Sequence, residues 1–515
     1  MTAAGGPAAR PAARVLAWGV ALPAVAGAAS VFGFAPFGAW PVPIACLAAL
    51  FLAWSRSGSP LQAAITGFAF GLGLNLAGVS WVFVSLHQFG HMPAALAAVA
   101  TFLFCAYLAL FPAAAGWAAH RLAPPGSPLA RVAIPAAFVL LEWVRGWLFT
   151  GFPWLVVGYS QAPASPLAGF APVLGAYGVS LAVAGCAALL AGLAQSPAWS
   201  RRRAVFAGAF VALLAAGGAL RFVAWTEPAG KAVAVALLQG NVSQHDKWRD
   251  DVRERTLRDY FAQIVASPAR VVILPETALP AFLDQLPAGY LDALREHARE
   301  RGKDILIGAV ERSRPGERFT YWNSVVRIGS DEPASYRKRH LVPFGEFIPS
   351  GFGWILAVLK IPLTDFARGE ASQPPLSAGG TTWAVAICYE DIFGEELIAA
   401  MPGAAILLNV SNDAWFGESL AAEQHLQFSQ MRALETGRWM VRATNTGVTA
   451  AIDEKGRVVA KLAPFTRGAL AAGPVPHSGA TPFAWWGNHA ALALVAAMLA
   501  LAAGRSYGRS RKPVK

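Results

Sequence analysis

The stretch "WAVAICYEDIFGEE", from Trp383 to Glu396, decides the fold of the central part of this chain. It begins with an apolar run that favours a β-strand, and that run ends at Cys388. Acidic residues follow directly, so a thiol lies where a buried strand gives way to a polar segment. In α/β proteins, functional groups collect beyond the carboxyl ends of strands. The stretch therefore predicts a strand of an α/β domain with a candidate functional cysteine at its end.

Similar apolar runs recur on both sides of this stretch and alternate with polar, helix-forming segments. Such alternation predicts a layered α/β domain. We expect its strands at 232–240, 270–276, 304–310, 321–329, 381–388, 404–411 and 447–453. A helix is expected to begin at an N-cap, Ser419, and to end at Gly437. The sequence "DEKG", from Asp453 to Gly456, predicts a hairpin turn.

The flanks of this domain differ from it in composition. The 515 residues are 55% hydrophobic and only 14% charged, with a mean hydropathy of +0.44. Glu142 is the only acid before Glu227, and none follows Glu454. We therefore predict three parts: a membrane part with seven helices at 1–225, a soluble domain at 226–480, and an eighth membrane helix with a basic tail at 481–515.

Apolar stretches in the flanks are candidates for membrane-spanning helices, which need about 20 residues each. They lie at 15–33, 40–54, 61–85, 94–119, 132–150, 173–194, 204–222 and 485–504. The fifth contains Glu142 and Arg145, whose spacing allows them to pair on one helix face. Either this pair has a function within the membrane, or it anchors the span at the outer interface.

Basic residues predict the orientation of these spans through the positive-inside rule. The candidate cytoplasmic segments contain no acid and hold Arg10, Arg14, Arg56, Arg121, Arg131, Arg201, Arg202, Arg203, Arg505, Arg509, Arg511, Lys512 and Lys515. We expect a multi-pass membrane protein with both termini cytoplasmic and the soluble domain on the outer side of the membrane. The net charge of +12 then reflects topology and anionic lipid headgroups, and we expect no nucleic-acid partner. The first span also resembles a signal peptide, although we expect it to be retained.

Cys388 is the only cysteine outside the apolar spans. Cys46, Cys105 and Cys186 are expected to be buried as small apolar residues. The spacing of the cysteines matches no metal-binding pattern, so we expect no metal and no cofactor. A lone thiol in an oxidising compartment has no partner within the chain, which makes Cys388 a candidate nucleophile.

Two further residues could activate this thiol. Glu276 follows the apolar run "VVILP", and Lys338 lies in "YRKRHLVPFGEFIP". A lysine ammonium would favour the thiolate and could stabilise an oxyanion. A glutamate whose pKa is raised by burial could accept the thiol proton. Spacing alone leaves open whether the three side chains meet.

The segments "ILPETALP", "YRKRHLVPFGEFIP" and "AICYEDIFGE" resemble the three signature regions of the nitrilase, or carbon–nitrogen hydrolase, superfamily. Apolar spans surround this domain, and the segments "EWVRGWLFTGFPW" and "SNDAWFGES" are similar to sequences of the apolipoprotein N-acyltransferase family. The chain resembles that family from about Val15 to its last span. The resemblance implies a four-layer α-β-β-α nitrilase-like sandwich inserted in an eight-helix transmembrane bundle.

The resemblance also implies roles for individual residues. Four of them would be catalytic. Glu276 would be the general base, and Lys338 would stabilise the oxyanion and transfer a proton. Cys388 would be the nucleophile, and Glu346 a supporting glutamate. Four others would contact the substrates. Tyr389 and Glu390 would do so beside the nucleophile, and Trp248 and Trp415 at a lipid portal. A weaker match in the membrane part falls on Trp143 and Trp147.

The implied reaction is a ping-pong acyl transfer. Cys388 would take an acyl chain from the sn-1 position of a phospholipid such as phosphatidylethanolamine. It would pass that chain to the α-amine of the diacylglyceryl-cysteine of an apolipoprotein. We expect the enzyme to be a monomer in the lipid bilayer. Two alternatives remain: a membrane-anchored amidase that uses water as the second nucleophile, and a non-catalytic membrane scaffold.

Other polar residues have plainer interpretations. We expect His340 and His425 to take no part in catalysis. Glu390 has either a role in the site or a role at a helix end. The other acids after Cys388 are expected in first helical turns, because acidic side chains are favoured at the positive end of the helix dipole: Asp391, Glu395 and Glu396. The apolar stretch 351–366 is either a core element or, as we expect, an interfacial arm that reaches lipid.

Overall fold

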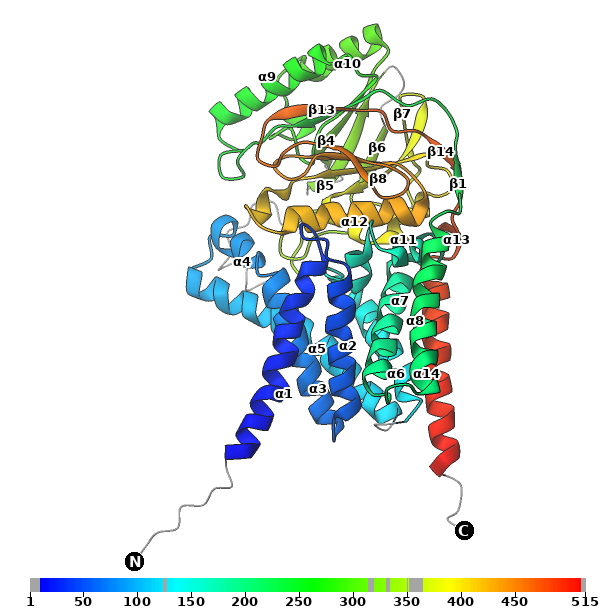
Figure 1. Cartoon of the computed structure of the whole chain (residues 1–515). Coiled ribbons are helices and arrows are strands. Elements are labelled where there is room, and N and C mark those ends of the chain that lie inside the picture. Colours follow the sequence, from blue (N-terminus) through cyan, green and yellow to red (C-terminus); the bar gives the residue numbers. More distant parts are fainter. Residues whose placement is uncertain are drawn as a thin grey trace, which may run out of the picture.

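The computed structural model of the chain describes residues 10–123, 127–313, 319–329, 334–349, 351 and 365–510. It has a helical part and an α/β part, and the chain leaves the helical part, forms the α/β part and returns (Figure 1). Helices α1 (Arg10–Ala29) and α14 (His489–Ser510) both extend to the end of the helical part that is farthest from the α/β part. The expected interfacial arm lies outside the described residues, apart from Gly351, Asp365 and Phe366.

A helix overlaps each predicted span in the described residues. The others are α2 (Pro41–Arg56), α3 (Pro60–Gly78), α5 (Ala94–Leu122), α6 (Ala130–Arg145), α7 (Ala171–Ala194) and α8 (Arg201–Leu220). Among the described residues, 4 helices are long and apolar enough to cross a membrane, and shorter apolar helices lie at 19–33, 41–56 and 489–504. Helix α6, which carries Glu142 and Arg145, falls in neither group, so the number of spans stays a prediction.

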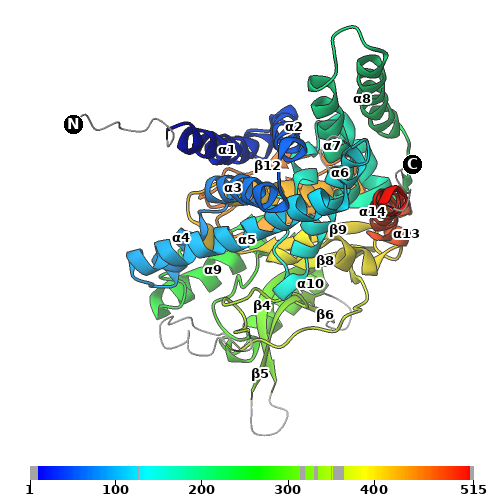
Figure 2. The ribbon, with the colours of Figure 1, turned by 90° about the horizontal axis from the view of Figure 1, so that it is seen from below.

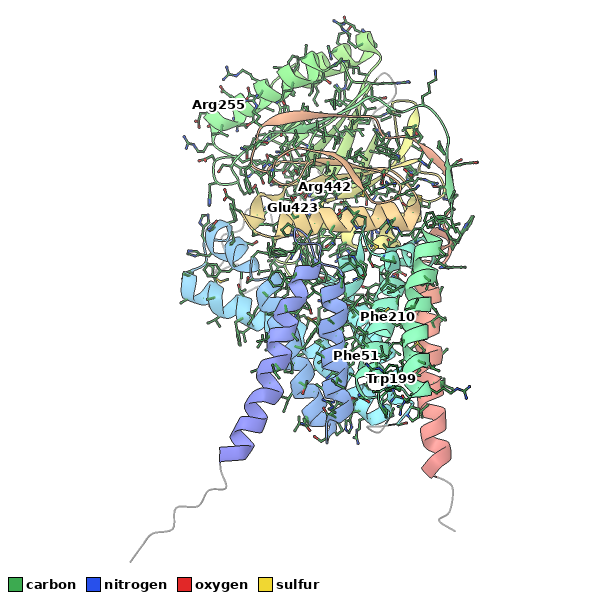
Figure 3. The ribbon with its side chains drawn as sticks, in the orientation of Figure 1. Phe51, Trp199, Phe210, Arg255, Glu423 and Arg442 are labelled. Atoms are coloured by element: carbon green, nitrogen blue, oxygen red, sulfur yellow. The ribbon has the colours of Figure 1, made fainter. Side chains whose placement is uncertain are left out.

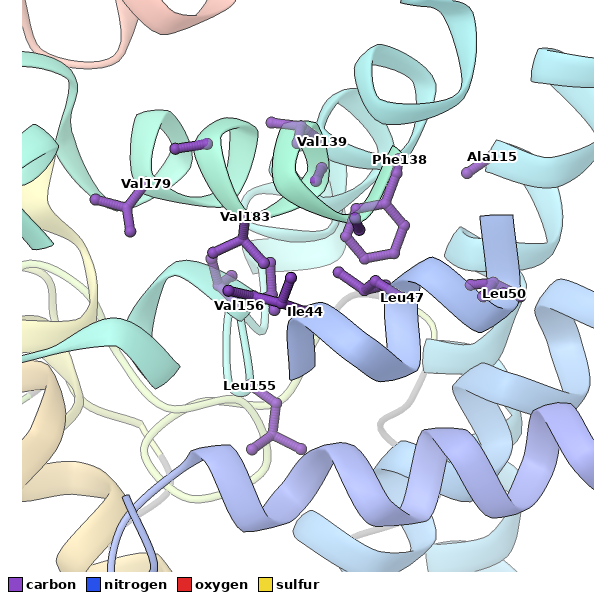
Figure 4. Packing of buried hydrophobic residues seen from close by; sticks show 14 of the residues in the cluster. Ile44, Leu47, Leu50, Ala115, Phe138, Val139, Leu155, Val156, Val179 and Val183 are labelled. Atoms are coloured by element: carbon purple, nitrogen blue, oxygen red, sulfur yellow. The ribbon is translucent and has the colours of Figure 1, made fainter. Parts of the chain in front are cut away.

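Small residues allow these helices to pack closely. Gly67 and Gly71 of α3 face Pro112 and Ala109 of α5, where an added Cβ would collide with backbone atoms. Apolar side chains from α2, α6 and α7 share one buried cluster, seen around Leu47 in Figure 4. Helix α8 stands beside α7 at the edge of the helical part and is exposed over most of its length (Figure 2), as expected for a helix surrounded by lipid.

The α/β part contains two 6-stranded sheets. The first has the order β13 (Gly468–Ala472), β2 (Val235–Gln239), β3 (Val271–Ile273), β4 (Asp304–Ser313), β5 (Thr320–Ile328) and β6 (Ala334–Arg337). The second has the order β12 (Val458–Lys461), β11 (Ala450–Ile452), β10 (Met440–Thr444), β9 (Ile406–Ser411), β8 (Thr381–Ile387) and β7 (Leu376–Ala378). Each predicted strand overlaps one of these, and the predicted hairpin joins β11 to β12. A short pair, β1 (Thr226–Pro228) with β14 (His477–Gly479), lies where the chain enters and leaves.

The two sheets pack face to face, and helices cover their outer faces. Leu237 and Ile273 of the first sheet share a buried cluster with Val385 and Leu408 of the second. Helices α9 (Asp250–Ala266) and α10 (Tyr290–Arg301) cover the outer face of the first sheet. Helix α12 (Ala421–Thr436) covers the outer face of the second.

Helix α12 also faces the helical part, and all its residues except Glu423 are buried (Figure 1). It ends at Thr436, and the next residue, Gly437, has a φ of 61° and terminates the helix as predicted. The prediction of Ser419 as N-cap is wrong. The helix begins at Ala421, and the Ser419 hydroxyl accepts the Ala421 N–H in a turn that precedes it.

Polar side chains of α12 bond directly to the helical part. The indole Nε1 of Trp154 donates to Oε1 of Gln424 at 2.6 Å. The Glu435 carboxylate accepts the N–H of Ala176 at 2.7 Å, next to Gly175, where α7 departs from helical geometry with a φ of 67°. The two parts therefore share hydrogen bonds as well as apolar contacts.

Glu142 and Arg145 are both buried and hold the loop that precedes α7. Oε1 of Glu142 accepts the N–H of Val157 at 2.7 Å, and Nη1 of Arg145 donates to the carbonyl of Trp154 at 2.8 Å. Both side chains therefore bond to backbone inside the protein, and the choice between a function in the membrane and an anchor at the interface stays a prediction.

Candidate active site

Three of the four predicted catalytic residues stand at or near strand ends of the two sheets. Glu276 comes shortly after β3 and Lys338 directly after β6, both in the first sheet. Cys388 directly follows β8 in the second sheet. Because the sheets pack face to face, side chains from these ends can meet between them.

The Glu276 carboxylate is 7% exposed and accepts hydrogen bonds on both oxygens. Oε1 accepts from Nδ2 of Asn323 at 2.7 Å and from Nζ of Lys338 at 3.4 Å. Oε2 accepts the backbone N–H of Asn412 at 2.8 Å. These donors come from different segments and fix the orientation of the carboxylate.

The Lys338 ammonium is 1% exposed and lies between two carboxylates. Nζ is 2.9 Å from Oε2 of Glu346 and 3.4 Å from Oε1 of Glu276. Burial by itself would lower the pKa of Lys338, but attraction to Glu346 and Glu276 outweighs it and raises the pKa. The ammonium therefore stays charged, and Glu346 is its nearest partner.

Cys388 has a backbone conformation that residues with a side chain seldom adopt. Its φ is 55°, in the left-handed region, which costs on the order of 1–3 kcal/mol. Its carbonyl oxygen accepts from Nδ2 of Asn409 at 3.0 Å and lies 3.2 Å from Nε2 of His425. These contacts hold the strained turn that presents the thiol.

The thiol of Cys388 responds to both neighbouring charges. Burial raises its pKa well above the usual value, the Glu276 carboxylate raises it further, and Lys338 opposes these effects only in part. Lys338 favours the thiolate, as expected, but burial and the Glu276 carboxylate outweigh its effect on the pKa of the thiol. The thiol is protonated at rest, so attack requires a base.

Glu390 and Tyr389, next to the nucleophile, both bond to other segments. The Glu390 carboxylate accepts the N–H groups of Ile387 and Arg339, each at 2.7 Å, and so ties the end of β8 to the segment that carries Lys338. Burial raises the pKa of Glu390 to about 7, although these bonds oppose the rise. The Tyr389 hydroxyl donates to the carbonyl of Gly151 in the helical part at 3.1 Å.

The predicted tryptophans differ in their surroundings. Trp248 is 40% exposed. The Trp415 carbonyl accepts the hydroxyl of Ser85 in the helical part at 2.7 Å. The rings of Trp143 and Trp147 contact each other, with centroids 5.5 Å apart, and Trp147 is exposed.

The acids after Cys388 occupy first turns, as the dipole argument predicts. Glu390 and Asp391 lie in the 3-10 helix Cys388–Ile392, and Glu395 and Glu396 lie in α11 (Gly394–Leu397). They also have specific partners. Glu396 lies 2.9 Å from Nδ1 of His340, and Glu395 accepts the N–H of Asn488 at 3.1 Å.

A buried ion cluster behind the nucleophile was not predicted. Arg442 of β10 donates to Asp391 at 3.1 Å and to Asp413 at 3.0 Å, and His425 lies 2.9 Å from each aspartate. All four side chains are buried, and Figure 3 shows Arg442 in the α/β part close to α12. Asn323, which bonds to both Glu276 and Glu346, was also missed. The sequence signal for both is a polar residue within an apolar strand run, in "MVRAT" and "WNSVV".

The arrangement supplies the groups needed for covalent acyl chemistry. Cys388 offers a nucleophile, Glu276 a base, and Lys338 a fixed positive charge for an oxyanion. Among the described residues, no group of His, Cys, Asp and Glu side chains could hold a metal ion. The arrangement fits addition of the thiol to a carbonyl carbon.

Comparisons with known proteins cover nearly the whole chain. Residues 26–189 match the apolipoprotein N-acyltransferase N-terminal domain, and residues 234–475 match the carbon–nitrogen hydrolase domain. The chain is 50% identical to an apolipoprotein N-acyltransferase of Nitrosomonas europaea, over 94% of this chain and 97% of the relative. It is 47% identical to one of Methylococcus capsulatus, over 92% of this chain and 94% of the relative. With a nitrilase-like α/β part and a set of apolar helices, the chain belongs to the apolipoprotein N-acyltransferase family.

Proposed function

We propose that this chain is a membrane enzyme that N-acylates apolipoproteins. It takes an acyl chain from the sn-1 position of a phospholipid of the phosphatidylethanolamine type. It transfers that chain to the α-amino group of an N-terminal diacylglyceryl-cysteine, which completes lipoprotein maturation. The observation that carries the proposal is a partly buried thiol beside a carboxylate and an ammonium, in a chain 50% identical to a relative named for this activity.

The proposed topology is eight spans of the inner membrane with both termini in the cytoplasm. Residues 1–225 and 481–515 would form the membrane part, and 226–480 a four-layer α-β-β-α domain in the periplasm. Large apolar side chains exposed on α5 and α8, such as Phe102 and Val211, support contact with lipid. Both substrates are lipids, and a monomer in the bilayer would meet them by lateral diffusion.

In the first half of the reaction, Sγ of Cys388 attacks the ester carbonyl carbon while Glu276 takes the thiol proton. The oxyanion that forms faces the Lys338 ammonium. The carbon–oxygen bond of the ester then breaks, and Glu276 gives its proton to the departing glycerol oxygen. The products are a thioester on Cys388 and a lysophospholipid.

In the second half, the α-amine of the acceptor attacks the thioester carbon. Glu276 takes a proton from the attacking nitrogen, and the carbon–sulfur bond breaks. The sulfur leaves as a thiolate and recovers the proton from Glu276, which restores the site. Because its pKa is raised, Lys338 keeps its proton throughout and acts by charge alone.

Intact-mass spectrometry after exposure to phospholipid tests the proposal. We expect a mass gain of one acyl chain, removable by hydroxylamine, on the peptide that contains Cys388. Glu276→Gln should slow its formation by about 10²–10⁴-fold, the usual contribution of a general base. Cys388→Ser should form no hydroxylamine-labile adduct. Cys46→Ser, at a free cysteine in α2, is the matched control and should behave like the wild type.

The products separate the proposal from its two alternatives. With a diacylated lipopeptide as acceptor, the proposed enzyme yields a triacylated lipopeptide. A membrane-anchored amidase would yield free acid instead, and a non-catalytic scaffold would yield neither product. Wild-type N-acylation by the Cys388→Ser variant would rule out the mechanism.

A further inference from the structure

A second lysine lies beside Glu276 and has no role in the reaction above. Lys247 belongs to the turn between β2 and α9 and is 2% exposed. Its Nζ donates to Oγ1 of Thr277 at 2.6 Å. Thr277 directly follows Glu276 and has a φ of 45°, which is a strained backbone conformation. Lys247 therefore bonds to the residue next to the proposed base.

The Lys247 ammonium has unused donors. An ammonium carries three N–H groups, and among the described residues the Thr277 hydroxyl is its one acceptor. No carboxylate in the described ranges forms an ion pair with it, whereas Lys338 pairs with both Glu276 and Glu346. Burying a cation without a partner costs several kcal/mol.

The charge on Lys247 nevertheless persists at neutral pH. Burial lowers its pKa to about 8, and attraction to the Glu276 carboxylate limits the fall. Below pH 8 most molecules therefore hold a buried ammonium with free N–H groups close to the base. Such a group suits an anion that arrives with a substrate.

The turn that carries Lys247 is fixed by the second sheet. Nδ2 of Asn412 donates to Oε1 of Gln244 at 2.8 Å, and the backbone N–H of Asn412 donates to Glu276. Asn445 accepts the N–H of Val242 at 2.9 Å and donates to its carbonyl at 2.8 Å. Lys247 and Glu276 are thus held by one set of asparagines at a constant relative position.

We propose that Lys247 binds the phosphodiester of the phospholipid donor. The inference rests on the proposed function, because a donor phosphate is joined to the scissile ester through glycerol alone. When the ester carbonyl reaches Cys388, this anion must lie near the residues around Glu276. The unused N–H groups of Lys247 then bond to phosphate oxygens, and Lys247 becomes a specificity residue for the first half of the reaction.

Lys247→Met tests this inference, because methionine keeps the apolar stem and removes the charge. Acyl-enzyme formation on Cys388 is measured in detergent micelles with two donors, a phosphatidylethanolamine and an uncharged p-nitrophenyl ester of the same fatty acid. We expect the variant to be about 10–100-fold slower with the phospholipid, as loss of a hydrogen bond to a charged group implies. The rate with the uncharged ester should stay within about twofold of wild type, and Lys247→Arg should recover part of the phospholipid rate.

Lys303→Met is the matched control, because Lys303 is also sheltered, donates to one neutral acceptor, the Ser267 carbonyl, and lies at the start of β4. It should leave both rates unchanged. An equal loss with both donors in Lys247→Met would reduce Lys247 to a residue that positions Thr277, and no loss would overturn the inference outright. Inhibition of the wild type by inorganic phosphate that disappears in Lys247→Met, while the rate with phospholipid stays unchanged, would assign the site to free phosphate instead of the lipid. Absence of any acyl-enzyme from phospholipid in the wild type would refute the proposed function itself.

Discussion

Asn323→Asp should disable Glu276, the proposed base, by placing a third carboxylate beside Glu276 and Glu346. Nδ2 of Asn323 lies 2.7 Å from Oε1 of Glu276 and 2.8 Å from Oε1 of Glu346, and the residue is 3% exposed. The substitution keeps the shape of the side chain but replaces a donor by an acceptor. It removes two hydrogen bonds to charged groups, each worth about 1.5–3 kcal/mol, and hence about 3–6 kcal/mol together.

Three carboxylates around one ammonium cannot all remain ionised, so at least one pKa in the group must rise. A proton on Glu276 prevents it from accepting the thiol proton. We expect acyl-enzyme formation at neutral pH to fall by about 10²-fold or more and to recover partly as the pH is raised. Rapid mixing with phospholipid, acid quenching and mass spectrometry across a pH series give these rates.

Asn241→Asp is the matched control for the charge change, because Asn241 is exposed and bonds only to backbone groups outside the site. It should leave the rate and its pH profile unchanged. If Asn323→Asp acylates at the wild-type rate with the wild-type pH profile, then Asn323 does not govern the ionisation of Glu276, and the electrostatic account of the site is wrong.

Three other substitutions test the surroundings of the nucleophile. Arg442→Met leaves two buried aspartates without their arginine and should lower the free energy of unfolding by about 3–5 kcal/mol, seen as a lower melting temperature by tryptophan fluorescence in detergent. The pKa of His425 is raised from 6.5 to about 9, so its stabilising charge is fully present below pH 6.5 and is lost as the pH rises through 9. Wild type should lose about 3 kcal/mol over that range, measured by denaturant unfolding, and His425→Gln should lose much less. Tyr389→Phe removes the bond to the Gly151 carbonyl and should slow acyl transfer about fivefold, or about 1 kcal/mol, in the lipopeptide assay.

The residues that could be predicted are those that lie in local sequence patterns. Cys388 ends an apolar strand and Glu276 follows another. Both motifs are short stretches of sequence that can be recognised without knowledge of the fold. The strands were predictable because buried strands leave continuous apolar runs. The ionisation of the thiol was not, because it depends on burial and on the distances between Cys388, Glu276 and Lys338, which only the packed sheets determine.

The ion cluster behind Cys388 could not be predicted because its members are distant in the sequence. Asp391, Asp413, His425 and Arg442 come from separate elements, and apart from the position of Arg442 in an apolar run no local pattern marks them. The same reason hid Asn323, a polar residue on a strand. Strand β10 was missed because Arg442 interrupts its apolar run, and that arginine is tolerated there only because two aspartates reach it.

Helix α12 has a consequence for how this protein can be divided. It packs against the second sheet on one side, and on the other it bonds to the loop before α7 and to α7 itself, so neither half is complete without the other. A truncated protein made of residues 226–480 alone would expose Gln424, Phe428 and Glu435 to water. We therefore expect the excised fragment to aggregate in aqueous buffer. We accordingly expect purification of residues 226–480 to require a detergent or lipid that covers the exposed face of α12.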